Sequence, residues 1–150
     1  MAPDDNRIKF NAISGYRIPI IIYDPAVNEK KVITQPVSQF DVMGTILSIG
    51  GYKDSIISYG RILPDSINTG EIIFSRANAS LYQVSDSAYV LGYNPTSKKA
   101  EFLYHYTADI DLQQNLLMDN VVADIRNKLT KKILAFLQKA SMQYNGVEFK

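Results

Sequence analysis

Four short segments rich in aromatic and β-branched residues follow one another in the second half of this chain. They span residues 71–75, 80–84, 88–93 and 100–106. Aromatic and β-branched side chains favour strands, and the turn-forming residues at 94–98 are typical of a hairpin loop. We therefore expect a small antiparallel sheet in this half.

The last 30 residues are dominated by an amphipathic pattern at residues 120–144. Three of its four lysines, Lys128, Lys131 and Lys132, lie on other faces than the apolar residues. A sheet this small needs a covered face to be stable, so we expect the helix to pack on it. The apolar positions follow a spacing of three and four, which indicates a helix: Val122, Ile125, Leu129, Ile133, Phe136 and Ala140.

The first half has the pattern of an α/β layer. Residues 18–23 are rich in isoleucine and end at a turn, which predicts a strand buried on both faces. Ser38 and Asp41 resemble a capping box that begins a helix ending at Ile49, before Gly50 and Gly51. Residues 52–70 read as an irregular surface segment.

Composition limits the organisation and the partners of the chain. With 150 residues and 46% hydrophobic content, a single unit is expected, with 1–70 as the edge of an α/β layer and 71–150 as sheet and terminal helix. A formal charge of +1 gives no argument for nucleic acid as a partner. No apolar run approaches the roughly 20 residues of a membrane-spanning helix, so no membrane contact by this segment is expected.

Few residues suggest catalytic or metal chemistry. The chain has no cysteine, and His105 is its one histidine, without a Gly-x-Ser-x-Gly nucleophile motif. We interpret His105 as a partly exposed sheet residue. Asp109 and Asp111 resemble the start of a calcium loop, but Gln114 and Asn120 occupy the positions of its glycine and glutamate. A polar turn is the preferred interpretation, and we expect no metal site in this chain.

Ten tyrosines raise a second possibility for the sheet. Tyr89 and Tyr93 share a strand face, and Tyr104 and Tyr106 lie in the next strand. Such a surface could stack on sugars, which would make the chain a non-catalytic module that binds glycans or proteins. Packing of the aromatic face against the terminal helix is the favoured interpretation.

Four pieces of the chain, taken in order, resemble the later half of sulfatases and of lipoteichoic acid synthase-like phosphoglycerol transferases, which belong to the alkaline phosphatase superfamily. The helix piece has Gly44 where the family usually has proline. The passage around His105 has that histidine where an aspartate is common. The pieces are YRIPIIIYDP at 16–25, VSQFDVMGTIL at 37–47, YGRIL at 59–63 and the stretch 101–117.

This resemblance implies the carboxyl-terminal portion of an alkaline phosphatase-like α/β/α fold, with a small antiparallel sheet and a long terminal helix. In the family, the threonine, serine or formylglycine nucleophile and most metal ligands precede the matched region. The implied parent is a metal-dependent phosphoester or sulfoester hydrolase, or a phosphoglycerol or phosphoethanolamine transferase, and the chain alone is expected to be inactive. A divalent metal (Mn, Mg, Zn or Ca) is implied for the parent only.

The resemblance also implies partners and a location. The rest of the parent domain would be the main partner, a phospho- or sulfo-ester its substrate, and the extracytoplasmic face of a bacterial membrane its home. Asn11, Tyr16 and Arg17 are the nearest substrate-binding candidates, because they lie between the metal-binding Asp-His pair that the resemblance implies and the buried strand. The guanidinium of Arg17 suits phosphate or sulfate. A surface or sheet-edge position is the preferred interpretation of Arg17. Exposed apolar surface at Ile20 and Ile22 would favour self-association of such a fragment.

Overall fold

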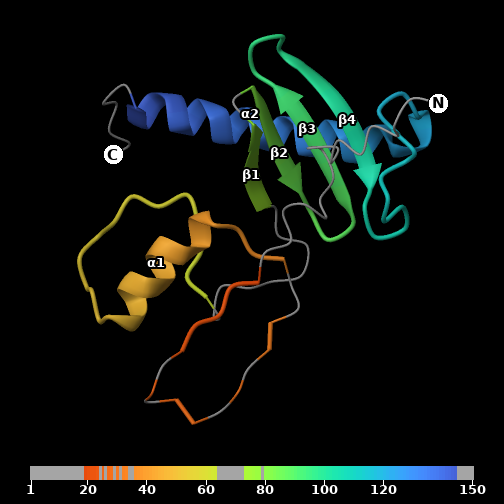
Figure 1. The fold of residues 1–150 in the computed structure, drawn as a ribbon. Coiled ribbons are helices and arrows are strands. Elements are labelled where there is room, and N and C mark those ends of the chain that lie inside the picture. Colours follow the sequence, from red (N-terminus) through yellow and green to blue (C-terminus); the bar gives the residue numbers. More distant parts are fainter. Residues whose placement is uncertain are drawn as a thin grey trace, which may run out of the picture. The chain divides into compact units, whose positions relative to one another are not determined.

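The computed structural model describes residues 19–23, 25, 27–28, 30, 32–33, 36–63, 73–78 and 80–144. The chain divides into two compact units, Met1–Thr69 and Gly70–Lys150. Helix α1 (Phe40–Ile49) lies in the first unit, and a four-stranded sheet with a long helix lies in the second (Figure 1). The expected α/β class is confirmed.

The sheet of the second unit is an antiparallel meander. Its strands are β1 (Ile73–Asn78), β2 (Leu81–Ser85), β3 (Tyr89–Asn94) and β4 (Lys99–His105). They lie in the order β1-β2-β3-β4, so each strand pairs with the next along the chain. The prediction of a small antiparallel sheet is confirmed, although β1 extends to Asn78, beyond the end that the pattern indicated.

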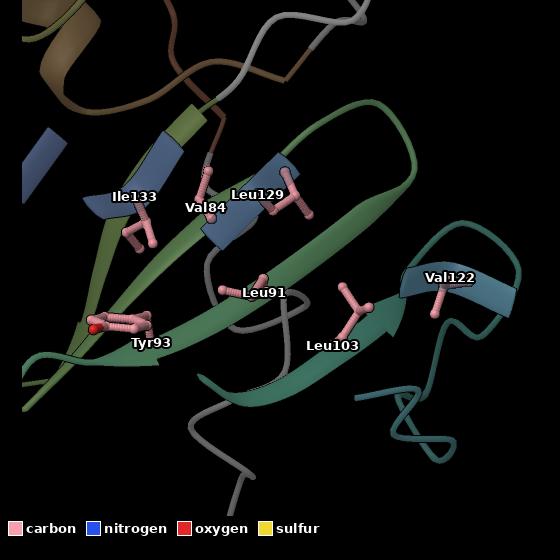
Figure 2. Packing of buried hydrophobic residues seen from close by; sticks show 7 residues of the cluster. All are labelled: Val84, Leu91, Tyr93, Leu103, Val122, Leu129 and Ile133. Carbon is pink, nitrogen blue, oxygen red and sulfur yellow. The ribbon is translucent and has the colours of Figure 1, made fainter. Parts of the chain in front are cut away.

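Helix α2 (Ala123–Tyr144) covers one face of this sheet, after a short 3-10 turn, η2 (Asn120–Val122) (Figure 1). Leu129 and Ile133 are completely buried. Phe136 stacks on Phe74 of β1 with ring centroids 4.3 Å apart. The predicted apolar face of the terminal helix is therefore confirmed. The buried cluster that joins helix and sheet contains Val84, Leu91, Tyr93, Leu103, Val122, Leu129 and Ile133 (Figure 2).

The turn between β2 and β3 is fixed by Asp86. Its carboxylate accepts hydrogen bonds from the amides of Ala88 and Tyr89, at 3.0 and 2.9 Å. The Tyr106 hydroxyl donates to the Asp86 carbonyl at 2.7 Å. Lys128 of α2 reaches the same carboxylate at 3.3 Å, but this lysine is half exposed and the ion pair adds little stability.

The outer edge of β4 is covered by the segment that follows it. The Asn115 side chain accepts a hydrogen bond from the Leu103 amide at 3.0 Å and donates to the Glu101 carbonyl at 3.3 Å. The Leu116 amide donates to the Leu103 carbonyl at 2.7 Å. The outward backbone groups of Leu103 and the carbonyl of Glu101, which an edge strand would leave unpaired, are therefore satisfied within the unit.

The buried strand predicted at 18–23 is wrong for the part that the structure describes. Residues 19–23 are not in a strand, and Ile21 and Tyr23 are 88% and 86% exposed. A strand is stabilised by hydrogen bonds to a neighbour, and no strand is assigned among the described residues of Met1–Thr69. An apolar pattern alone cannot supply that neighbour.

Helix α1 follows its sequence signals. The Ser38 hydroxyl accepts from the Phe40 amide at 3.2 Å, and the Ser38 amide donates to the Asp41 carboxylate at 2.8 Å. The bond from the Ser38 amide to Asp41 is one half of a capping box, whereas the residue at the N-cap position is Gln39, which makes no side-chain cap hydrogen bond. Beyond the helix, Gly51 has a φ of 75°, which favours glycine. The predicted beginning and end of this helix are confirmed.

Candidate functional site

The substrate-binding candidates Asn11, Tyr16 and Arg17 lie outside the described residues. Their assignment therefore stays a prediction. The polar sites among the described residues lie where α1 meets the segment after it and at the ends of the sheet.

A buried ion pair, which we call the Asp41–Arg61 clamp, is the main polar feature of the first unit. The Asp41 carboxylate, 2% exposed, accepts hydrogen bonds from the Arg61 amide at 2.7 Å and from Nη2 of its guanidinium at 2.7 Å. Arg61 Nε adds a longer contact of 3.3 Å. Arg61 Nη2 also donates to the Pro36 carbonyl at 3.2 Å. Both partners are thus held inside the unit.

Two further contacts bind the same segment to α1. The Thr45 hydroxyl donates to the Asp41 carbonyl at 2.6 Å and accepts from the Leu63 amide at 3.0 Å. At Gly60 the backbone approaches Phe40 so closely that any Cβ atom would collide with the Phe40 carbonyl. The helix piece and the YGRIL piece of the sequence are therefore held together by hydrogen bonds and by a close backbone contact.

The electrostatics of the clamp favour a charged carboxylate. Burial by itself would raise the pKa of Asp41, but hydrogen bonds from the Arg61 side chain and from the Ser38 and Arg61 amides outweigh it. The Arg61 charge acts in the same direction, so the pKa of Asp41 lies below its usual value. Because its donors are this chain's own, the carboxylate holds the segment in place rather than binding a substrate.

The lowered pKa of Asp41 predicts acid sensitivity of the first unit. A carboxyl group with a depressed folded pKa stabilises the fold above its unfolded pKa, about 3.9, and that contribution is lost as pH falls through the folded pKa. Unfolding of α1 in urea, followed by its NMR amide signals, should be nearly the same at pH 7 and pH 5 and require less urea at pH 3. In an Asp41→Asn variant this acid step should shrink, and an unchanged step would contradict the assignment.

His105 lies at the end of β4 and is partly exposed. Its ring packs against Tyr89 with centroids 4.4 Å apart. Its Nδ1 atom accepts from the Ala108 amide at 3.2 Å and lies 3.2 Å from the Thr107 hydroxyl. These contacts hold the ring within its own turn, in agreement with the interpretation of His105 as a sheet residue.

The Asp109 carboxylate closes the loop after β4 on itself. One oxygen accepts from the Gln113 amide at 3.0 Å, and the other accepts from the Gln114 amide at 2.7 Å. The Gln114 bond, with the Gln113 bond next, holds the pKa of Asp109 below its usual value. The predicted polar turn is therefore confirmed.

The family resemblance implies a divalent metal for the parent enzyme. The side chains that the structure describes do not form a binding site for such a metal. Among them, no three histidine, cysteine, aspartate or glutamate residues gather as ligands. No step through a metal is assigned to this part of the chain. In the same part, no helix has the length and apolar character needed to cross a bilayer.

The tyrosines of the sheet are used mainly for packing. Tyr93 and Tyr106 are 6% and 8% exposed, and Tyr93 lies in the cluster under α2. Tyr104 instead packs on Phe102, with centroids 5.2 Å apart, and burial, with the Asp109 charge second, raises its pKa. The prediction that the aromatic face packs under the helix is therefore correct for Tyr93. It is wrong for Tyr104, because strand alternation places these two tyrosines on opposite faces of the sheet.

The clamp was missed by sequence reasoning, which gave Asp41 only a capping role. Its partner lies 20 residues away in an irregular segment, and no periodicity connects them. The signal in the sequence that could have indicated the clamp is Arg61, which follows the glycine of YGRIL in an otherwise apolar piece.

No protein-family model matches the chain, and neither does any curated protein. Among solved structures, a candidate sulfatase from Bacteroides thetaiotaomicron VPI-5482 is similar over 73% of this chain, with 13% identity and a TM-score of 0.53. A second structure, BT4656 in complex with its substrate D-glucosamine-2-N,6-O-disulfate, is similar over 71% of this chain, with 15% identity and a TM-score of 0.47.

The two matches cover 26% and 24% of the solved chains. This chain thus spans about a quarter of the length of the structures it resembles. At 13% identity the first match establishes the fold alone. The chain has the fold of the carboxyl-terminal part of that solved candidate sulfatase.

Proposed function

We propose that this chain is the carboxyl-terminal part of a metal-dependent, sulfatase-like enzyme that hydrolyses or transfers a phosphoester or sulfoester group. The observation that carries the proposal is the shared fold, which covers 73% of this chain but only 26% of the solved candidate sulfatase. Most of such a domain would lie outside the present residues. We place the nucleophile and the metal ligands there.

The chemistry follows from this division of the domain. A divalent metal (Mn, Mg, Zn or Ca) bound by the remaining part would lower the pKa of a hydroxyl nucleophile and offset charge on the transferred group. The present chain would supply support: the Asp41–Arg61 clamp fixes α1 to the segment that follows it. Arg17, with Tyr16 and Asn11, would bind the anionic group of the substrate by charge-assisted hydrogen bonds.

The proposal includes a location and partners. The pieces 37–47 and 59–63 resemble those of lipoteichoic acid synthase-like transferases, whose enzyme domains are tethered to the membrane and face outward. We therefore propose a membrane-anchored parent at the extracytoplasmic face of the bacterial envelope. Its substrate would be a sulfate ester or a phosphoglycerol or phosphoethanolamine donor, and nucleic acid is not among its partners.

An activity comparison tests the proposal. The purified 150-residue chain should not hydrolyse p-nitrophenyl sulfate or bis-p-nitrophenyl phosphate, because the proposal places the activated hydroxyl and the metal that stabilise the developing charge in the remaining part of the domain. A polypeptide extended upstream in the same reading frame, through an Asp-His pair and a hydroxyl nucleophile, should turn over one of the two esters when loaded with a divalent metal.

Two outcomes would contradict the proposal. One is an extended polypeptide that binds metal and hydrolyses neither ester. The other is turnover by the 150-residue chain that disappears in the His105→Ala variant, which would make His105 a catalytic residue. The Lys131→Ala variant, changed on the exposed side of α2, is the control for nonspecific loss of activity.

A further inference from the structure

Helix α2 concentrates basic residues on its surface. Its 22 residues include five basic residues and one acidic residue, Asp124, in a chain whose formal charge is only +1. Three of its exposed lysines lie within about 40° of arc around the helix axis, because they are four and seven residues apart. These three, which we call the lysine row, are Lys128, Lys132 and Lys139.

The lysine row is arranged at a cost to the helix. Lys128 and Lys132 are four positions apart, where like charges repel and destabilise a helix. None of the residues three or four positions from Lys132 is acidic, so no pair within the helix offsets this repulsion. The ion pair of Lys128 with Asp86 is 3.3 Å long and half exposed, so it offsets little of it. A helix whose charges serve only solubility usually alternates acidic and basic residues at this spacing.

The spacing of the row fits a linear polyanion. Four and seven residues correspond to about 6 Å and about 10 Å along the helix axis. Successive ammonium groups can therefore contact successive anionic groups of one extended polymer. A lysine ammonium is a compact point charge, which attracts sulfate or phosphate without the fixed planar geometry of a guanidinium.

Two other anionic partners fit the row less well. Proteins that bind single-stranded nucleic acid add aromatic side chains on which bases stack, but Phe136 of α2 is stacked on Phe74. A helix that binds a membrane surface adds apolar anchors. Leu129 and Ile133 are buried, which leaves Leu134 as the one large apolar residue exposed on the described part of α2.

We propose that the lysine row binds a linear sugar or polyol polymer that bears repeated sulfate or phosphate groups, and that this polymer is the substrate of the parent enzyme. The binding follows from the row itself. The assignment of the polymer as substrate rests on the proposed function, which supplies the chemistry on a sulfate or phosphate ester.

A binding experiment with matched double variants tests this proposal. The probes are fluorescein-labelled dextran sulfate and long-chain polyphosphate, titrated with the 150-residue chain and followed by fluorescence anisotropy at several salt concentrations. The chain should bind at least one of them and should not bind unsulfated dextran. For the double variant Lys132→Gln/Lys139→Gln, affinity at low salt should fall at least about tenfold. The slope of log affinity against log salt should become shallower by roughly two, because two ionic contacts are lost.

The control removes the same charge from another exposed place in the same unit. Lys98→Gln/Lys99→Gln, at the loop between β3 and β4, should change the affinity less than about twofold. Glutamine and lysine have similar helix propensities, so urea unfolding of the row variant should match that of the unchanged chain. A difference in affinity between the two double variants then reports the row rather than net charge or folding.

The preferred probe identifies the source of the anionic groups: tighter binding of dextran sulfate indicates a sulfated polymer, and tighter binding of polyphosphate a phosphorylated one. Three results would overturn the proposal. They are binding of neither polymer, equal losses of affinity in the two double variants, and binding of duplex DNA or of phosphatidylglycerol vesicles that is tighter than that of both polymers.

The outcomes also separate this proposal from the proposed function. Row-dependent binding of a polymer, together with an extended polypeptide that hydrolyses no ester, would support the row as a binding site and contradict the proposed function. Ester hydrolysis by the extended polypeptide, with no binding of either polymer to the 150-residue chain, would support the proposed function and overturn the binding site.

Discussion

Replacing Asp41 with asparagine should destabilise the first unit by about 3 kcal/mol, the low end of the range for breaking a buried ion pair. The Asp41 carboxylate is 2% exposed and accepts hydrogen bonds from the Arg61 guanidinium and from two backbone amides. An asparagine has one acceptor oxygen and no charge, so it cannot satisfy all of these donors. The loss stays at the low end because the Arg61 side chain, 18% exposed, can still reach water.

Hydrogen exchange of the α1 amides at pH 7 is the direct measurement for this variant. Protection of α1 should fall, while protection of β2, β3 and α2 should change little, since the clamp lies in the other unit. Asp54→Asn is the matched control, because Asp54 is exposed. Equal protection of α1 in the two variants would show that the clamp does not hold the segment after α1.

The second large effect is expected at Leu129, which is completely buried between α2 and the sheet. Leu129→Ala should cost about 2 to 5 kcal/mol, because it removes buried methyl groups and leaves a cavity against the cluster of Figure 2. Urea unfolding followed by circular dichroism measures this change. Lys131→Ala, on an exposed face of the same helix, should stay within about 0.5 kcal/mol.

The comparison of the two α2 variants decides whether the helix is part of the unit's core. Equal and small effects would mean that α2 is detached from the sheet in solution or paired with another chain. A large effect of Leu129→Ala alone would confirm that α2 stabilises the second unit through this cluster.

The second unit was largely predictable from its sequence because its signals are local. The spacing of Leu129 and Ile133 identified the buried face of α2, and the turn residues at 94–98 marked the hairpin between β3 and β4. The capping residues Ser38 and Asp41 likewise marked the beginning of α1. In each case the residues that specify the structure are close neighbours in sequence.

The first unit was less predictable because its structure depends on distant partners. Residues 18–23 have the composition of a buried strand, but a strand needs a neighbour that composition cannot identify. The Asp41–Arg61 clamp joins an ordinary capping residue to an arginine in an irregular segment. The resemblance to sulfatases supplied the correct fold class, and Asn11, Tyr16 and Arg17 remain predictions.

The position of Asn115 beside β4 has a consequence for how wide the sheet can become. Its side-chain amide has the same donor and acceptor as a peptide group, and it occupies the place that the backbone of a fifth strand would take. Together with the Leu116 amide, this side chain therefore occupies the outward backbone groups of β4 at Glu101 and Leu103. Addition of a further strand at this part of β4 would therefore require the Asn115 segment to detach first.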